Sequence, residues 1–322
     1  MSNPHSDLPP QLVTMGETLA LLSSWPERPL RHATSLDLTI GGSESNVAIG
    51  AARLGVRTAW MGRVGDDEFG QLITRELLAE RVLLDTSVDP HRPTGLMLKS
   101  RRTGGLAQVT YYRQGSAGAN LAIADLDTEI LRTATVFHTS AITPALGESA
   151  RDAVHQSLEL CQAFDTRISI DLNYRRVLWD RDTAATEYRY LISKADIVFA
   201  TEDEARIVSD ADTPAGLAQD LTKLGATNAV IKLGSHGAVA CVDGAEVVVQ
   251  PVPVRVVDSV GAGDAFAAGY LTGLIDGAAT KECLAWGNLM GAWSVSTRGD
   301  WQGLPNRDEL HSINTIEDDV RR

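Results

Sequence analysis

An aspartate follows a short glycine turn in the segment 256–269, which reads VVDSVGAGDAFAAG. β-branched residues precede the turn and an apolar run follows it, so the turn is predicted to open a helix. The first N–H groups of a helix have no partner within it, and the helix dipole is positive there. Gly261, Ala262 and Gly263 could therefore bind an anion such as phosphate. Asp264 could then accept the proton of a hydroxyl that attacks this phosphate.

The same turn also has a structural interpretation, in which Asp264 only caps or charges the start of the helix. The two interpretations predict different effects when Asp264 is replaced. Losing a cap lowers stability by about 1 kcal/mol, whereas losing a catalytic base lowers the rate on the order of 10²-fold or more. Two known glycine motifs are absent. The chain has no G-x-x-x-x-G-K-[ST], and Phe266 stands where G-x-G-x-x-G requires its third glycine.

The composition predicts a soluble globular protein of the cytoplasm. The chain has 322 residues, which is enough for one large α/β domain or two small ones. Its formal net charge of -13 argues against non-specific binding to nucleic acid or anionic membrane. Cys161, Cys241 and Cys283 form no zinc or disulfide pattern, which fits a reducing compartment. No apolar run approaches the roughly 18 residues of a membrane span. Residues 1–10 are polar and Pro-rich, which predicts a disordered lead-in and not a signal peptide.

Strand-like and helix-like segments alternate along most of the chain. This alternation predicts an α/β fold with a mainly parallel sheet covered by helices. Buried strands are predicted at residues 58–65, 135–142, 167–174, 196–201 and 228–234. Helices are predicted within residues 66–82 and 148–164.

Two regions, 19–40 and 94–112, break the alternation because they are extended and have no helix between strands. They predict a small β-sheet that stands off the main sheet as a lid. A further hairpin is predicted within residues 237–251, where Asp243-Gly244 is a strong turn signal.

Two long signatures resemble those of the ribokinase-like sugar kinases. DSVGAGDAFAAGYL resembles the C-terminal signature of that family, and GGSESNVAIGAARLG followed by GRVGDDEFG resembles its N-terminal signature. The resemblance extends over residues 12–310. It implies one kinase domain over residues 1–322, built as a three-layer sandwich with a β-sheet lid. It also implies transfer of the ATP γ-phosphoryl group to a sugar hydroxyl, with Asp264 as base. Gly261, Ala262 and Gly263 are then the anion hole.

Other segments are similar to the 2-keto-3-deoxygluconate kinases within that family. These segments are VTYYRQGSAGANL, SAITPAL, DLNYRRVLW and RGDWQGLP, together with Glu17 in MGETLALL. The chemistry agrees, because a sugar acid has a carboxylate that arginine pairs bidentately. The predicted reaction is phosphorylation of the terminal hydroxyl of 2-keto-3-deoxygluconate. A kinase of fructose or ribose, and a non-catalytic sugar sensor, are the alternatives.

The resemblance also implies the residues of the sugar site. Gly41 makes the turn before the site, and the lining residues are Gly42, Asn46, Tyr111, Arg113, Arg175 and Asp300. Each arginine has a structural alternative, namely a surface ion pair. Met97 stands where the family usually has a lid tyrosine, which leaves the galactonate epimer open as a substrate.

The implied cofactors are ATP and Mg²⁺, with K⁺ left open. The residues that match the nucleotide side are Asn173, Thr201, Lys232, Gly234, Ser235, Gly237 and Asn288. Asn288 has an alternative as a satisfied core polar group. Glu204 matches an acid that organises Mg²⁺ through water, and its alternative is a solvated helix start. Asp258, before the catalytic turn, is the residue that would bind K⁺.

The expected partners are a small sugar acid and ATP, with no nucleic acid and no membrane. The predicted lid leaves a sheet edge and an apolar face exposed. Pairing the lids of neighbouring subunits would cover both, so a homo-oligomer, at least a dimer, is predicted.

Overall fold

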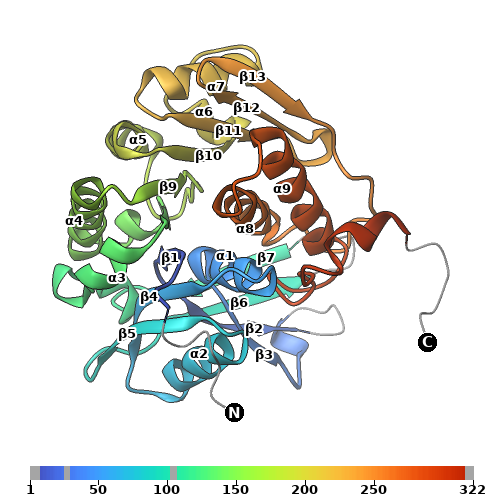
Figure 1. Cartoon of the computed structure of the whole chain (residues 1–322). Helices are drawn as coiled ribbons and strands as arrows, with labels where there is room; N and C mark the ends of the chain where they lie inside the picture. The colour runs from blue at the N-terminus through green and yellow to red at the C-terminus, as the bar shows by residue number, and fades with distance from the viewer. Residues whose placement is uncertain (1–7, 25–29, 102–106, 316–322) are drawn as a thin grey trace.

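The computed structural model describes residues 8–24, 30–101 and 107–315. Nine strands of the described chain form one sheet in the order β13-β12-β11-β10-β9-β8-β1-β4-β5 (Figure 1). Their bounds are β1 Leu12–Met15, β4 Thr58–Gly65, β5 Leu83–Asp89, β8 Val136–Ser140, β9 Arg167–Asp171, β10 Ile197–Thr201, β11 Asn228–Lys232, β12 Ala238–Val242 and β13 Ala245–Val249. The pairs from β5 to β11 are parallel, and β12 runs antiparallel to both of its neighbours. The predicted mainly parallel sheet is confirmed.

Helices cover both faces of this sheet, which gives three layers (Figure 1). One face packs against α1 Ser43–Arg53, α2 Glu68–Ala79, α8 Ala262–Ile275 and α9 Thr280–Val295. The other face packs against α3 Thr128–Thr133, α4 Glu148–Phe164, α5 Arg181–Lys194 and α7 Pro214–Lys223, and α6 Glu202–Ala205 follows β10. Alternate strand residues supply the two cores: Phe199 faces the first, and its neighbours Val198 and Ala200 face the second.

The predicted elements are mostly confirmed, with corrections at their ends. The helix within residues 148–164 is α4, and the helix within 66–82 is α2, whose start is capped by the Asp67 carboxylate accepting from Gly70 N–H. The hairpin is confirmed as β12 and β13. The strand predicted over 167–174 is too long, because β9 ends at Asp171 and the next residues form a loop. β1 and β5 are not among the predicted strands, and β5 is an edge strand whose side chains are mostly only half-buried.

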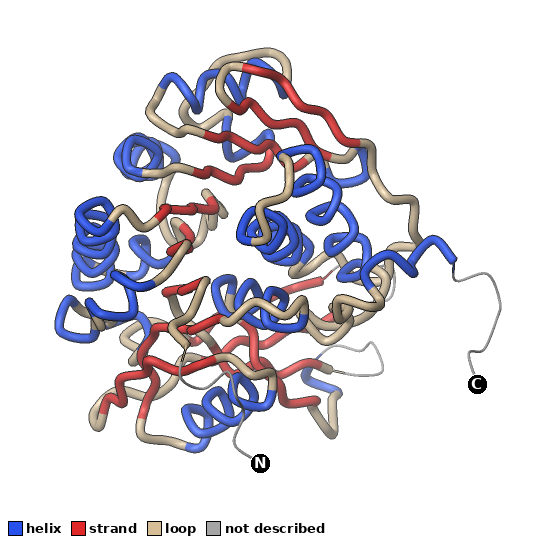
Figure 2. The backbone as a smooth tube through the Cα atoms, in the orientation of Figure 1, coloured by secondary structure: helices blue, strands red, loops and turns tan. Residues whose placement is uncertain are grey.

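A second, smaller sheet has the order β3-β2-β6-β7. Its strands are labelled in the lower part of Figure 1, and the same region of Figure 2 shows them in red. Its strands are β2 Leu19–Ser23, β3 Asp37–Gly41, β6 Leu96–Arg101 and β7 Ala107–Tyr112. The outer pairs are antiparallel, and the central pair β2–β6 is parallel. The predicted small sheet is therefore confirmed, and it is called the small sheet below.

The start of the chain is partly described. Residues 1–7 of the predicted lead-in lie outside the described residues. Pro10 is buried, and the carbonyl of Pro9 accepts a hydrogen bond from Arg57 Nε at 3.0 Å, so these two residues pack against the domain. None of the helices in the described ranges is both long and apolar enough to cross a membrane.

Candidate active site

The carboxyl ends of the parallel strands meet at one edge of the main sheet, where open α/β sheets bind ligands. Asp171 ends β9, Thr201 ends β10 and Lys232 ends β11. Their side chains and the loops that follow therefore lie near one another. The start of α8, which carries the glycine turn, faces the same edge, because Lys232 Nζ lies 3.2 Å from where a Cβ on Gly263 would stand.

Asp264 is buried at the start of α8, where two side chains from α1 bind its carboxylate. Ser43 Oγ donates to Oδ1 at 2.7 Å, and Asn46 Nδ2 donates to Oδ2 at 2.8 Å. Asn173, after β9, donates in turn to Ser43 Oγ at 2.9 Å. This chain of hydrogen bonds fixes the orientation of the carboxylate from two elements far away in sequence. Asn173 has φ +33°, a left-handed conformation that asparagine tolerates better than most residues.

Burial raises the pKa of Asp264 to about 7, against the hydrogen bonds from Asn46 and Ser43, which lower it. The charge of Asp171 raises this pKa further, and that of Arg175 lowers it. A general base works best when its pKa lies near the working pH. Asp264 therefore has both the fixed geometry and the proton affinity of a base at neutral pH.

The glycine turn requires glycine at position 261. Gly261 is the N-cap of α8 and has φ +81°, where a side chain is strained. A Cβ on Gly261 would clash with the backbone carbonyl of Asp300, so the two loops are in direct contact. The N–H groups that open α8 remain available to an anion. Lys232, next to Gly263, adds a positive charge at this place.

Lys232 makes an ion pair with Asp171, with 2.5 Å between Nζ and Oδ2. Burial alone would lower the pKa of Lys232, but the charges of Asp171, Glu204 and Asp264 outweigh burial and raise it. Lys232 is therefore a permanent cation between three carboxylates at the sheet edge.

Glu204 organises the loops beside Lys232. Its Oε1 accepts from Tyr174 N–H at 3.0 Å and its Oε2 from Thr201 N–H at 2.7 Å, while Thr201 Oγ1 accepts from Glu204 N–H at 3.3 Å. The last two bonds form a capping box at the start of α6. Within the described ranges, no three His, Cys, Asp or Glu side chains gather closely enough to hold a metal ion.

The small sheet reaches the glycine turn through Asp300. Gly41 and Met97 of the small sheet lie near the Asp300 side chain, and the Asp300 backbone packs against Gly261. A Cβ on Gly41 would lie 2.9 Å from Met97 Cε and 3.0 Å from Asp300 Oδ2, so a larger residue would displace one of these side chains. Gly42 is the N-cap of α1, and a Cβ there would lie 2.6 Å from the carbonyl oxygen of Glu17. Asp300 is buried and accepts from Lys99 Nζ at 3.1 Å. The structure thus brings these predicted sugar-site residues together beside Asp264.

Arg113 has a partner of its own within the chain. Its Nε donates to Glu17 Oε2 at 2.6 Å, and Ser116 Oγ donates to the other carboxylate oxygen of Glu17. The guanidinium also lies 5.5 Å from the centre of the Tyr111 ring, at cation–π distance. The Arg113 charge is therefore balanced by Glu17 in a largely buried ion pair, whereas the alternative drawn from the sequence was an ion pair at the surface.

Arg175 differs, because its side chain is exposed and makes no hydrogen bond or ion pair with the described residues. Its charge lowers the pKa of both Asp264 and Asp300, so it lies close to both carboxylates. Arg175 is thus the arginine whose charge is available to an anionic ligand at this site.

The loop after β11 carries the remaining glycines. Gly234 has φ +57° and Gly237 has φ +89°, and Ser235 between them is exposed. Asn288 lies on α9, where its Nδ2 donates to the carbonyl of Gln250 at 2.9 Å. Its side chain therefore ties α9 to the loop after β13.

Sequence reasoning missed three side chains of this site: Ser43, Asp171 and Lys99. Ser43 lies inside the N-terminal signature, where it directly follows Gly41 and Gly42 and begins α1. Its hydroxyl could therefore have been predicted to face the site. Asp171 ends a predicted strand and could have been found from that position. Lys99 gave no signal, because a lysine in a small edge sheet is normally solvated.

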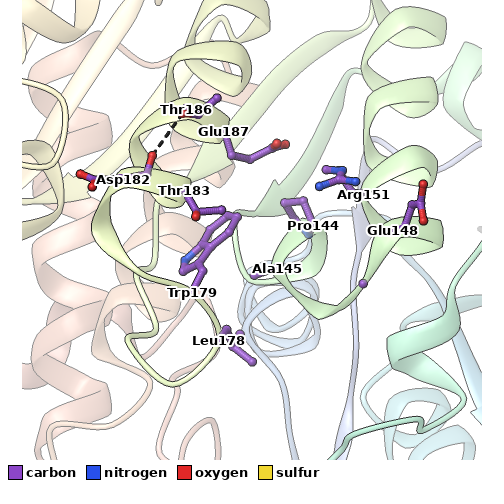
Figure 3. A pocket seen from close by; sticks show the side chains of 11 residues that line it. Pro144, Ala145, Glu148, Arg151, Leu178, Trp179, Asp182, Thr183, Thr186 and Glu187 are labelled. Carbon is purple, nitrogen blue, oxygen red and sulfur yellow. Dashed lines mark hydrogen bonds between the residues drawn. The ribbon is translucent and has the colours of Figure 1, made fainter.

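A cavity of about 580 Å³ lies apart from this site, between α4, α5 and the loop before α5 (Figure 3). Pro144, Arg151, Trp179 and Glu187 are among its lining residues. None of the predicted site residues lines this cavity. It is therefore distinct from the place where Asp264 lies.

Comparison with known proteins decides the family. The sequence pattern of the pfkB family carbohydrate kinases matches residues 10–307. The chain belongs to this family. It is 37% identical over 305 residues to the 2-dehydro-3-deoxygluconokinase of Bacillus subtilis (strain 168), covering 94% of each chain. It is 33% identical over 294 residues to the 2-dehydro-3-deoxygalactonokinase of Haloferax volcanii, covering 90% of this chain and 92% of that one.

Its fold is also similar to that of a pfkB protein of known structure, from Polaromonas sp. JS666. The TM-score is 0.87 at 32% identity, and the match covers 94% of this chain and 100% of that one. The resemblance drawn from the two signatures is confirmed, and so are the predicted fold and the prediction of a carbohydrate kinase.

Proposed function

We propose that this pfkB kinase transfers the γ-phosphoryl group of ATP to the terminal hydroxyl of 2-keto-3-deoxygluconate, which is also called 2-dehydro-3-deoxygluconate. The observation that carries the proposal is Asp264, a buried and doubly hydrogen-bonded carboxylate at the anion-binding start of α8. The name of the relative from Bacillus subtilis supports the substrate.

The proposed chemistry uses Asp264 as base. The Asp264 carboxylate takes the proton of the sugar hydroxyl while the hydroxyl oxygen forms a bond to the γ-phosphorus. The bond between the γ-phosphorus and the oxygen that bridges it to the β-phosphate breaks, and ADP leaves. The N–H groups of Gly261, Ala262 and Gly263 stabilise the charge on the transferred group. Lys232 adds a cation beside that position. Closure of the small sheet would exclude water from the transfer.

The nucleotide and its Mg²⁺ are assigned to the other side of the glycine turn. Gly234 and Ser235 are exposed in the turn after β11, which suits close approach of a ligand to the backbone, and the buried Gly237 ends that turn. Asn173, Thr201 and Asn288 complete the nucleotide side in this proposal. Glu204 suits Mg²⁺ held through water, because both of its oxygens already accept from backbone N–H groups and Mg²⁺ keeps most of its waters. When bound, the ion would neutralise charge on the phosphates.

Recognition of the sugar acid is assigned to Arg175 in the first place. Its exposed guanidinium is close to Asp264 and Asp300, and it has no partner among the described residues. Arg113 is bound to Glu17, so it would contribute by holding Tyr111 and the small sheet in place. Gly42, Asn46 and Asp300 would contact the sugar hydroxyls.

The galactonate epimer is a second candidate substrate. Met97 cannot supply the hydroxyl of the usual lid tyrosine, so a contact that would help to select one epimer is missing. The name of the relative from Haloferax volcanii agrees with this candidate.

The outer face of the small sheet supports a homo-oligomer. Leu38, Leu22 and Leu98 lie side by side across three strands, and Leu38 is 49% exposed. A second copy would cover these side chains, so we expect a dimer or a larger assembly joined through this sheet. Light scattering after size exclusion tests this, and a monomer for both the wild type and Leu38→Lys would contradict it.

A coupled ADP-release assay tests the substrate. The panel is 2-keto-3-deoxygluconate, its galactonate epimer, gluconate, fructose and ribose, each with ATP and Mg²⁺. Selective turnover of a keto-deoxy acid is expected. Turnover of fructose or ribose alone would overturn the assigned role of Arg175, and no turnover of any sugar would favour a non-catalytic sensor.

A further inference from the structure

Lys99 of the small sheet lies buried between two aspartates of the main domain. Its Nζ is 2.9 Å from Asp258 Oδ2 and 3.1 Å from Asp300 Oδ1. The side chain is 7% exposed, and both aspartates are buried as well. A buried charge is stable only when it is paired and hydrogen-bonded, so the three groups depend on one another.

Each aspartate connects this ammonium to the anion-binding turn. Asp258 Oδ1 accepts from Val260 N–H at 3.2 Å, and Val260 directly precedes Gly261. The backbone of Asp300 packs against Gly261 so closely that no Cβ fits between them. Lys99 therefore holds together two loops that flank the N–H groups proposed to bind the transferred phosphoryl group.

The position beside Asp258 is the one that the sequence left open for K⁺. The residues present do not fit that ion, because a fixed ammonium already lies within hydrogen-bond distance of the Asp258 carboxylate. A second cation at this place would meet strong repulsion from Lys99 at short range.

We propose that Lys99 replaces a monovalent cation beside the anion-binding turn and acts as a positioning residue for it. The inference rests on the kinase activity proposed above and adds a residue that the family signatures do not contain. Lys99 belongs to β6, so the small sheet supplies the ammonium that the two aspartates share. Turnover then needs no K⁺, and it needs Lys99.

The experiment compares four proteins in a buffer whose only monovalent cation is tetramethylammonium, which is too large for this place. Lys99→Ala removes the charge and leaves room for a small cation. Lys99→Met removes the charge and keeps the space filled. Lys223→Ala is the surface control, since Lys223 pairs with Asp220 on α7 and is 71% exposed. Each protein is assayed alone, with K⁺ and with ethylammonium.

The wild type and Lys223→Ala are expected to change by less than about twofold when K⁺ at about 100 mM is added. Lys99→Ala is expected to lose on the order of 10²-fold in kcat, because the turn is no longer held in place. K⁺ or ethylammonium should restore about tenfold or more of that loss. Lys99→Met should be as slow and should not respond. A wild type activated by K⁺, a fully active Lys99→Ala, or a loss that neither cation reverses would each overturn the proposal.

Thermal unfolding tests the role of Lys99 independently of the proposed substrate, because the measurement needs no turnover. K⁺ at ten times its dissociation constant should raise the Tm of Lys99→Ala by about 2 °C and leave that of the wild type unchanged. If Lys99→Ala does not fold, the wild type still decides, because a K⁺-specific rise of its Tm or its rate would refute the proposal.

Discussion

Replacing Asp264 by asparagine tests the assignment of the base and its electrostatics together. The variant keeps the size of the side chain, so Ser43 Oγ can still donate to the remaining oxygen. The new amide would face Asn46 Nδ2, but Asn46 Oδ1 has no partner in the described part of the chain and can turn to accept. Asp264→Asn should therefore fold, bind ATP, and lose on the order of 10²-fold or more in kcat.

The pH dependence gives the second magnitude. With a pKa of about 7, Asp264 is about one tenth ionised at pH 6 and about nine tenths ionised at pH 8. The base must be ionised, so kcat/KM of the wild type should rise about tenfold between these pH values and then level off. A profile that is flat from pH 6 to 8 would refute the raised pKa, and normal turnover of Asp264→Asn would remove the base itself.

Stability should change in the opposite direction. A carboxyl whose pKa is raised by folding contributes stability below its unfolded value near 3.8, and this is lost as the pH rises through about 7. The ionised group then costs the folded state up to about 4 kcal/mol. Asp264→Asn should therefore be more stable than the wild type in urea unfolding at pH 8, with a smaller difference at pH 5. Asp180→Asn is the matched control, because asparagine caps α5 equally well and Asp180 is an exposed residue at the start of a different helix.

Four further substitutions, with Gly55→Ala as a control, test the surroundings of Asp264. Arg175→Ala should raise KM for the sugar acid about ten- to a hundredfold and leave the Tm unchanged, and an unchanged KM would contradict its assignment to the sugar carboxylate. Arg113→Ala should instead lower the free energy of unfolding, measured in urea, by about 3 kcal/mol, because Glu17 stays buried without its cation. Met97→Tyr should change KM for the sugar about threefold or more at constant KM for ATP, and a change confined to ATP would mean that Met97 does not face the sugar. Gly261→Ala should lower stability more than Gly55→Ala, because Gly55 has a similar positive φ but open space around it. Only Gly261→Ala should also lower kcat. Equal losses of stability would show that the contact between Gly261 and Asp300 is unimportant.

The sequence alone determined the fold class and the glycine turn that precedes Asp264. The alternation of strand-like and helix-like segments follows from local periodicity, and α4 matches its predicted range. The glycine turn before Asp264 is also local, because a left-handed Gly261 and a helix start are readable within a few residues. Both signatures lie in continuous segments, so the family could be inferred before any contact was known.

The tertiary structure decided what surrounds that turn. Ser43 and Asp264 are 221 residues apart, and Lys99 is 159 residues from Asp258 and 201 from Asp300. Such pairs depend on strand order and on how the small sheet lies over the main domain, which no local pattern encodes. Arg113 shows the same limit, because its motif predicts a ligand for the sugar carboxylate, while folding brings it to Glu17, 96 residues away. Burial sets the proton affinity of Asp264, and burial is a property of the packed chain and not of its sequence neighbours.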